Sequence, residues 1–93
     1  MLLHLVLVRF DDPADTEEAE RRVRALMGRV EVLRRLDVGR NVVASGRAYD
    51  LGIFAEFDTL DDLDTYQNHP EHVPVAEFIR ERRSAVAAVD FFA

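Results

Sequence analysis

The densest group of proton-transfer side chains in this sequence is the segment Tyr66-Gln67-Asn68-His69-Pro70-Glu71-His72. Its imidazole and phenol side chains are groups that can exchange protons or donate hydrogen bonds. Two further residues stand out because each interrupts an apolar run, His4 near the start and Asp90 near the end. A buried carboxylate needs a partner, and the imidazole of His4 is the obvious candidate.

Each of these residues also has a structural interpretation. His4 could be a core imidazole with one hydrogen bond, and His69-Pro70 could cap and redirect a helix. The spacing His69-x-x-His72 matches a two-histidine metal pair, but no inward third ligand is evident and Pro70 disturbs the helical spacing. We therefore expect no metal and no cofactor.

Composition excludes several classes of protein. The 93 residues predict one domain, residues 1–93, and 12 basic against 18 acidic residues give a net charge of −6. That balance argues against nucleic acid and against an anionic membrane surface as partners. The sequence has no cysteine and no lysine, which excludes disulfides, thiolate chemistry and Schiff-base chemistry.

No segment of the sequence predicts membrane insertion or export. The longest apolar run has only the length of a strand, which is too short to cross a bilayer. Met1-Leu2-Leu3 lacks the charged start of a signal peptide. We expect a soluble, cytoplasmic protein.

The elements that must position these side chains alternate in a recognisable order. Apolar and β-branched runs predict four strands, at Leu3–Phe10, within Val32–Val43, at Tyr49–Phe57 and at Ala85–Phe92. Helical spacing predicts a helix of about four turns from Asp15, which Gly28 could end early. It also predicts a second helix capped by Asp58-Thr59 and a further one over Val73–Arg83 after Pro70. The order β-α-β-β-α-β predicts a ferredoxin-like α+β fold, a four-stranded antiparallel sheet with the helices on one face.

Strand residues alternate between the two faces of a sheet. On the predicted helix-facing side, His4 and Asp90 lie among apolar residues that we expect to line a ligand site, namely Val6, Val8, Leu51, Ile53, Ala55 and Ala88. The opposite side is also apolar, through Leu3, Leu5, Leu7, Phe54, Val89 and Phe91. Two helices cover only one face, so this second patch predicts a homodimer through the sheet. The alternative is a monomer whose terminal segments fold over that face.

The sequence resembles the stress-responsive A/B barrel, or Dabb, family of the dimeric α+β barrel superfamily. Its most specific motif lies in residues 63–72, where the family has Tyr-x-x-His-Pro-x-His. The resemblance extends over nearly the whole chain, through His4–Phe10, Gly39-Arg40-Asn41, Tyr49-Asp50-Leu51, Glu56-Phe57 and Val89-Asp90-Phe91. It implies a dimeric α/β barrel.

One branch of this family, the plant polyketide cyclases of the olivetolic acid type, is similar at these positions and catalyses a cofactor-free aldol condensation. Carried over, the resemblance implies His72 as general base and Tyr66 as hydroxyl donor to an enolate. It implies His4 and Asp90 as pocket groups, with Asp90 orienting His72. The chain departs from the cyclases at Leu51, where they have a histidine.

Three functional hypotheses follow. The first is a pocket for a small apolar or aromatic molecule between sheet and helices, used for binding or for cofactor-free acid–base chemistry. The second is a non-catalytic dimeric module for stress or assembly, in which the histidines and tyrosines are structural. The third is a cofactor-independent monooxygenase of the same superfamily.

Overall fold

The computed structural model describes residues 1–93. Along the chain its elements are β1 (Leu2–Phe10), α1 (Asp15–Arg24), β2 (Arg35–Arg40), β3 (Leu51–Phe57), α2 (Leu60–Gln67), α3 (Val73–Arg82) and β4 (Arg83–Phe92). The strands form one antiparallel sheet in the order β2-β3-β1-β4. This arrangement confirms the predicted ferredoxin-like α+β fold, with the second helical segment divided into α2 and α3.

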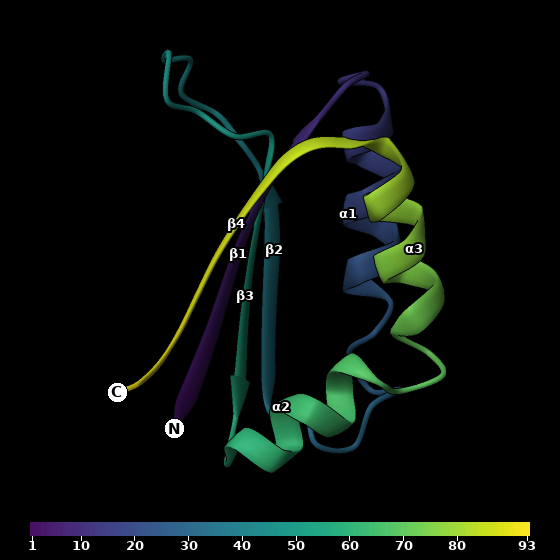
Figure 1. Ribbon diagram of the computed structural model, residues 1–93, viewed down its shortest axis with the longest axis vertical. Coiled ribbons are helices and arrows are strands. Elements are labelled where there is room, and N and C mark those ends of the chain that lie inside the picture. The colour runs from purple at the N-terminus through teal and green to yellow at the C-terminus, as the bar shows by residue number, and fades with distance from the viewer.

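The helices lie on one side of the sheet (Figure 1). Helices α1 and α3 stand beside each other over what we call the inner face, and α2 crosses near one end of the strands. The opposite side, the outer face, carries no helix. None of the three helices has both the length and the apolar character that crossing a membrane requires.

The register of the strands assigns every side chain to one of these faces. His4 lies opposite Ala55 of β3 and Asp90 of β4, while Leu5 lies opposite Phe54 and Val89. In β3 each inner residue is buried and each outer residue is only half-buried. The alternation predicted from the sequence therefore places His4 and Asp90 on the same, helix-facing side.

Helix α1 is shorter than the predicted four turns. It ends at Arg24, and Gly28 has a φ of +88°, a backbone conformation that L-residues rarely adopt and that a continuing helix cannot contain. Leu26 and Val30 continue the apolar spacing and are buried, but they belong to a series of turns and a bend that follow the helix. Periodic burial alone does not distinguish the two.

Strands β2 and β3 are also shorter than predicted. Val42 and Val43 are 93% and 68% exposed and belong to a loop over residues 41–50, which projects from the sheet in Figure 1. The base of this loop is fixed by Asp50, whose carboxylate accepts a hydrogen bond from the backbone N–H of Phe10 at 2.8 Å. Its own N–H donates to the carbonyl of Val8 at 2.9 Å.

The turn between α2 and α3 is built from its own polar groups. Thr59 caps α2 as predicted, because its hydroxyl accepts the backbone N–H of Asp62 at 3.1 Å. After Pro70, the backbone N–H of Glu71 donates to Nδ1 of His69 at 3.1 Å. His69 thus stabilises the turn that redirects the chain into α3.

A register shift in β4 changes which face its first residue joins. Arg9 pairs with Ala85 but Phe10 pairs with Arg83, so Ser84 is the extra residue of a β-bulge. Because Phe10 is an inner residue, the bulge turns Arg83 toward the helix side. Further along β4, Val86 on the inner face is 42% exposed, so the helices leave this edge of the sheet uncovered.

Candidate functional site

A cavity of about 240 Å³ lies between the inner face and the helices, on the β4 side; we call it the inner cavity. Apolar side chains dominate its walls, with a few polar groups among them. The residues that line it are His4, Val6, Val8, Val23, Leu26, Ile53, Tyr66, Gln67, His72, Val75, Ala76, Ile79, Arg80, Arg83, Val86 and Ala88. An apolar cavity with few convergent polar groups is the usual form of a small-molecule site.

Three aromatic polar side chains from separate parts of the chain meet at one end of this cavity. Tyr66 comes from the last turn of α2, His72 from the residue before α3, and His4 from β1. The ring centroids of Tyr66 and His72 are 4.4 Å apart, and those of His4 and Tyr66 are 6.4 Å apart. Both histidine rings therefore lie close to one phenol.

Asp90 reaches this group through His4. One oxygen of its carboxylate accepts a hydrogen bond from Nδ1 of His4, whose side chain is 10% exposed, against 38% for Asp90. The strand register explains the pair, since the two residues face each other across β1 and β4. The partner predicted from the two residues is therefore found. The carried-over arrangement, with Asp90 orienting His72, is not the one in the structure.

His72 has a backbone partner instead. Its Nδ1 lies 3.2 Å from the carbonyl oxygen of Gln67. A carbonyl only accepts hydrogen bonds, so in the neutral ring Nδ1 carries the proton and Nε2 holds the lone pair. Burial lowers the pKa of His72 below 6.5, and the neighbouring His4 and His69 lower it further, against the opposing effect of the Gln67 carbonyl. The neutral imidazole is therefore favoured at pH 7.

Tyr66 is both a core residue and a lining residue. It is 3% exposed, its ring packs against Phe57 at 5.0 Å between centroids, and burial raises its pKa to about 12. The phenol is therefore protonated at any physiological pH. Every fully buried polar side-chain atom in the chain has a hydrogen-bond partner. Because no protein group bonds to the Tyr66 hydroxyl, this oxygen is in contact with accessible space.

The structure brings most of the predicted lining residues to the inner cavity. Val6, Val8, Ile53 and Ala88 lie in its walls. Two others lie elsewhere: Ala55 is completely buried in the core beneath Tyr66, and Leu51 is 1% exposed among residues that pack under α1 and α3. Face alternation selects the correct side of the sheet, but it does not tell which inner residues the helices cover.

Sequence reasoning missed the wall that α3 and the start of β4 contribute. Val75 and Ile79 are spaced for one side of a helix, so the sequence contains a signal for this wall. Arg80 and Arg83 line the cavity although they are charged. The alternation of the strand does not predict that Arg83 lines the cavity, because Arg83 reaches the inner face only through the bulge at Ser84.

His69 does not form a metal site with His72, and it contacts other groups than His4 and His72 do. Its Nε2 is 3.7 Å from a carboxylate oxygen of Glu31, and its Nδ1 accepts the Glu71 backbone N–H. The structure has no group of three or more His, Cys, Asp or Glu side chains arranged to hold a metal ion. The contacts of His69 match its interpretation as a residue of the helix-redirecting turn.

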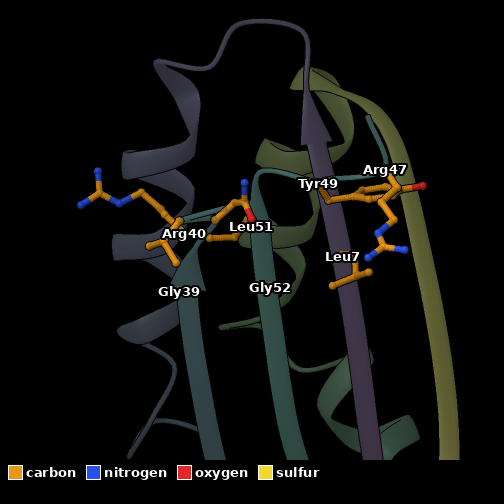
Figure 2. A pocket seen from close by; sticks show the side chains of 9 residues that line it. Leu7, Gly39, Arg40, Arg47, Tyr49, Leu51 and Gly52 are labelled. Atoms are coloured by element: carbon orange, nitrogen blue, oxygen red, sulfur yellow. The ribbon is translucent and has the colours of Figure 1, made fainter. Parts of the chain in front are cut away.

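A second depression, which we call the outer hollow, lies beside the loop over residues 41–50 and has a volume of about 520 Å³. Figure 2 shows Tyr49 and Arg47 on the side of Leu7, with Arg40 directed away. The guanidinium of Arg9 lies 4.5 Å from the centroid of the Tyr49 ring. This hollow has no histidine and no carboxylate in its lining, so it lacks a proton-transfer pair.

The remainder of the outer face is apolar and uncovered. Leu7 is 43%, Val89 55% and Phe91 42% exposed, and Leu3, Leu5 and Phe54 lie beside them in the register. Polar side chains lie at its edge on β2, where Arg35 pairs with Asp37 at 2.8 Å and lies over the Phe54 ring. An apolar centre with a polar edge is the anatomy of a protein interface.

Comparison with known proteins agrees with this geometry. Residues 2–93 match the model of the family described as "Stress responsive A/B Barrel Domain". The chain belongs to this family. This match confirms the family that we inferred from the Tyr-x-x-His-Pro-x-His motif and from the segments His4–Phe10 and Val89-Asp90-Phe91.

Individual relatives extend over the full length of the match. An uncharacterised protein of Streptomyces coelicolor is 32% identical over 93 residues, which cover 95% of this chain and 96% of that protein. A dimeric ferredoxin-like protein of unknown function from Bacteroides fragilis is 28% identical with a TM-score of 0.87, covering 99% of this chain and 95% of the other. Another from Thermobifida fusca has 24% identity and a TM-score of 0.88, covering 99% and 90%.

Proposed function

We propose that the inner cavity binds a small apolar or aromatic molecule and performs cofactor-free acid–base chemistry on it. The observation that carries this proposal is the convergence of Tyr66 and His72, with ring centroids 4.4 Å apart, in the wall of an otherwise apolar cavity. His72 is the general base, and Tyr66 donates a hydrogen bond to the oxygen of a developing enolate. The reaction class is proton abstraction beside a carbonyl, as in an aldol-type cyclisation.

The two side chains are in the protonation states that this chemistry needs. Neutral His72 directs its protonated Nδ1 to the Gln67 carbonyl, which leaves Nε2 as the atom that takes the proton. Tyr66, with a pKa of about 12, keeps its proton and therefore remains a donor. The base and the donor stay distinct because burial moves their pKa values in opposite directions.

His4, held by Asp90, serves as a further polar group in the wall of this site. The carboxylate of Asp90 fixes the imidazole of His4 with Nδ1 as donor, so that Nε2 of His4 remains free to accept a hydrogen bond. We assign this pair to positioning and substrate binding, and the proton-transfer step to His72. Val6, Val8, Ile53 and Ala88 supply apolar contacts with the substrate.

Hydrogen–deuterium exchange of a ketone tests the proposal. Phenylacetone has an aromatic ring and an activated methylene group beside its carbonyl. In D₂O, His72 would remove a methylene proton and solvent would return a deuteron, which ¹H NMR follows as loss of the methylene signal. We expect exchange above the buffer rate, and a decrease of about 10²–10⁴-fold in the His72→Gln variant.

His69→Gln is the matched control, because it removes the other histidine of the same turn, whose contacts are with Glu31 and Glu71. It should change the exchange rate far less than His72→Gln does, because His69 acts on His72 only through its charge and through the turn. A wild-type rate equal to that of buffer, or a His72→Gln variant as fast as wild type, would favour the non-catalytic alternative. Oxygen consumption during the incubation would favour the monooxygenase alternative.

We also propose that the protein is a homodimer in which two outer faces pack together. The apolar residues Leu3, Leu5, Leu7, Phe54 and Phe91 form the centre of the contact. The support is an uncovered apolar face with a polar edge, together with the dimeric state of the Bacteroides fragilis relative. Light scattering at micromolar concentration should give about twice the 10.6 kDa of one chain, and a stable monomer would overturn this assignment.

A further inference from the structure

Two arginines at the inner cavity have no carboxylate partner; Arg9 and Arg47 also lack one, but they lie beside the outer hollow. Most arginines form ion pairs with side chains of Asp or Glu, namely Arg21, Arg22, Arg24, Arg29, Arg34, Arg35, Arg40 and Arg82. Arg80 and Arg83 line the inner cavity and form no such pair, although the chain has more acidic than basic residues. An excess of acids makes two neighbouring unpaired cations at one cavity an unexpected feature.

The two residues reach the cavity from different elements. Arg80 is in the last turn of α3, and Arg83 is the first residue of β4, turned inward by the bulge at Ser84. Both are exposed residues that nevertheless contribute to the lining. An arginine can lay its aliphatic stem along apolar surface while its guanidinium stays at the water boundary. The charges therefore belong to the rim of the cavity rather than to its interior.

This rim lies at the opposite end from the proton-transfer residues. Along β1, His4 pairs with Asp90 at one end and Phe10 pairs with Arg83 at the other. The six residue steps from His4 to Phe10 correspond to roughly 20 Å between backbone positions. The gap between the polar side chains is shorter, because Arg80 and Arg83 at one end and Tyr66 and His72 at the other all line the same cavity. Between these ends the lining is apolar, with Val6, Val8 and Ala88. The cavity is thus polar at both ends and apolar in its middle.

We propose that the molecule bound in the inner cavity carries a carboxylate, and that Arg80 and Arg83 bind this group while the apolar body of the molecule extends toward His72 and Tyr66. This inference rests on the proposed function and adds the class of its substrate, an apolar carboxylic acid. A guanidinium matches the two oxygens of a carboxylate with paired N–H donors. The volume of about 240 Å³ exceeds the roughly 150 Å³ that suffices to hold benzene, so the body corresponds to one ring with a short chain.

The local charge also decides what the cavity attracts. A chain with a net charge of −6 repels anions at long range, whereas Arg80 and Arg83 act within a Debye length of about 8 Å at physiological salt. A neutral apolar molecule gains nothing from them. An acid gains two charge-assisted contacts at the end of the cavity that is open to water.

Binding of a matched acid and amide tests the proposal. 3-Phenylpropanoic acid and 3-phenylpropanamide have the same ring and chain and differ in the charge of the end group. Titration calorimetry in 20 mM buffer, with the ring signals of His4 and His72 followed by NMR, should give about 10-fold tighter binding for the acid. Raising the salt concentration should reduce this ratio, because the contacts are at the rim.

The double variant Arg80→Gln/Arg83→Gln should bind acid and amide equally. Both side chains are exposed and unpaired, so the variant is expected to fold, and each single variant should show an intermediate ratio. Arg47→Gln is the control for Arg83→Gln, because Arg47 also forms no ion pair and belongs to the outer hollow. It should keep the full ratio.

Three results separate this inference from the proposed function. Equal wild-type binding of acid and amide, with the histidine signals shifted, would overturn the role of the arginines and leave the cavity as a binding site. An acid preference that survives in the double variant would do the same. If neither probe binds at 10 mM, the cavity is not a ligand site and both proposals fail.

Discussion

The two faces of the sheet are made by the same strands, yet they differ in where polar side chains lie. On β1, inner His4 alternates with outer Leu3 and Leu5, so the polar residue is on the face that the helices cover. A monomer exposed to water would have the reverse pattern. The difference supports the proposal that the outer face contacts a second chain, and it shows that the inner face includes polar side chains within its apolar packing.

The faces also differ in how completely they are closed. The inner face is covered over β1 and β3 but open along β4, which gives a cavity with one accessible side. The outer face is open everywhere and has no histidine in its apolar centre. Substitutions that affect one face and spare the other therefore test whether the two roles are independent.

The largest effect is expected from Leu5→Asp, which places a charge in the centre of the outer face. Without a partner, a buried carboxylate is strongly unfavourable. We expect dimer affinity to fall by at least about 4 kcal/mol, roughly 1,000-fold in Kd, so that light scattering gives a monomer or the protein unfolds.

Leu60→Asp is the matched control for this change. Leu60 is 58% exposed at the start of α2, where an acidic side chain suits the helix N-terminus. It should leave the mass and the stability unchanged. A Leu5→Asp variant that remains a dimer would show that the outer face is not the contact.

Smaller effects are expected when either of two adjacent alanines of β4 is replaced by phenylalanine. Each substitution should affect only the face on which that alanine lies. Ala88 lines the inner cavity, and Ala87 pairs with Leu7 on the outer face. Ala88→Phe should fill the cavity and weaken binding of 3-phenylpropanoic acid by at least about 10-fold while the dimer persists. Ala87→Phe should weaken the dimer and leave binding of the acid by each chain unchanged.

Calorimetry and light scattering on both variants check this prediction. The same loss of ligand binding in both would indicate that the two faces are coupled through the strand. The sheet would then behave as one cooperative unit rather than as two independent surfaces.

The smallest effect is a pH dependence that belongs to the inner face. Burial lowers the pKa of His72 in the folded chain below its unfolded value of 6.5, so the unfolded chain binds more protons between the two values. The stability that His72 contributes is therefore present above pH 6.5 and lost as the pH falls through the folded pKa. Urea unfolding at pH 7.5 and pH 5 should show a larger loss for wild type than for His72→Gln.

NMR titration of the His72 ring measures the same shift directly. The midpoint should lie below 6.5 in the folded protein. A midpoint at or above 6.5 would mean that His72 is more hydrated than its contacts with Tyr66 and the Gln67 carbonyl indicate, and would weaken its assignment as a base that is neutral at pH 7.

The fold was accessible from the sequence because its strands alternate and its breaks are explicit. Pro70 separates two helices, and Thr59 supplies a cap that local hydrogen bonding alone determines. The predicted element boundaries are wrong where a residue's burial or strand propensity does not match its secondary structure. Leu26 and Val30 continue a helical spacing through turns, and Val42 and Val43 have strand propensity but belong to a projecting loop.

The candidate site was only partly accessible. The pairing of His4 with Asp90 follows from strand parity, which a sequence contains. The contact of His72 with the Gln67 carbonyl does not, because it depends on how the turn after Pro70 closes. The burial of Ala55 in the same core cluster as Tyr66 was not predictable either, because it depends on where α2 crosses the sheet.

The bulge between Arg9 and Phe10 has a consequence for how this family's sequences are compared. Side chains alternate along β4, so counting back from Ala85 puts Arg83 on the outer face, and only the extra residue Ser84 changes this assignment. A relative with identical residues in β4 but a regular ladder would direct that guanidinium to the outer face. Two aligned sequences can therefore agree at every position of this strand and still place one charge on opposite faces of the sheet.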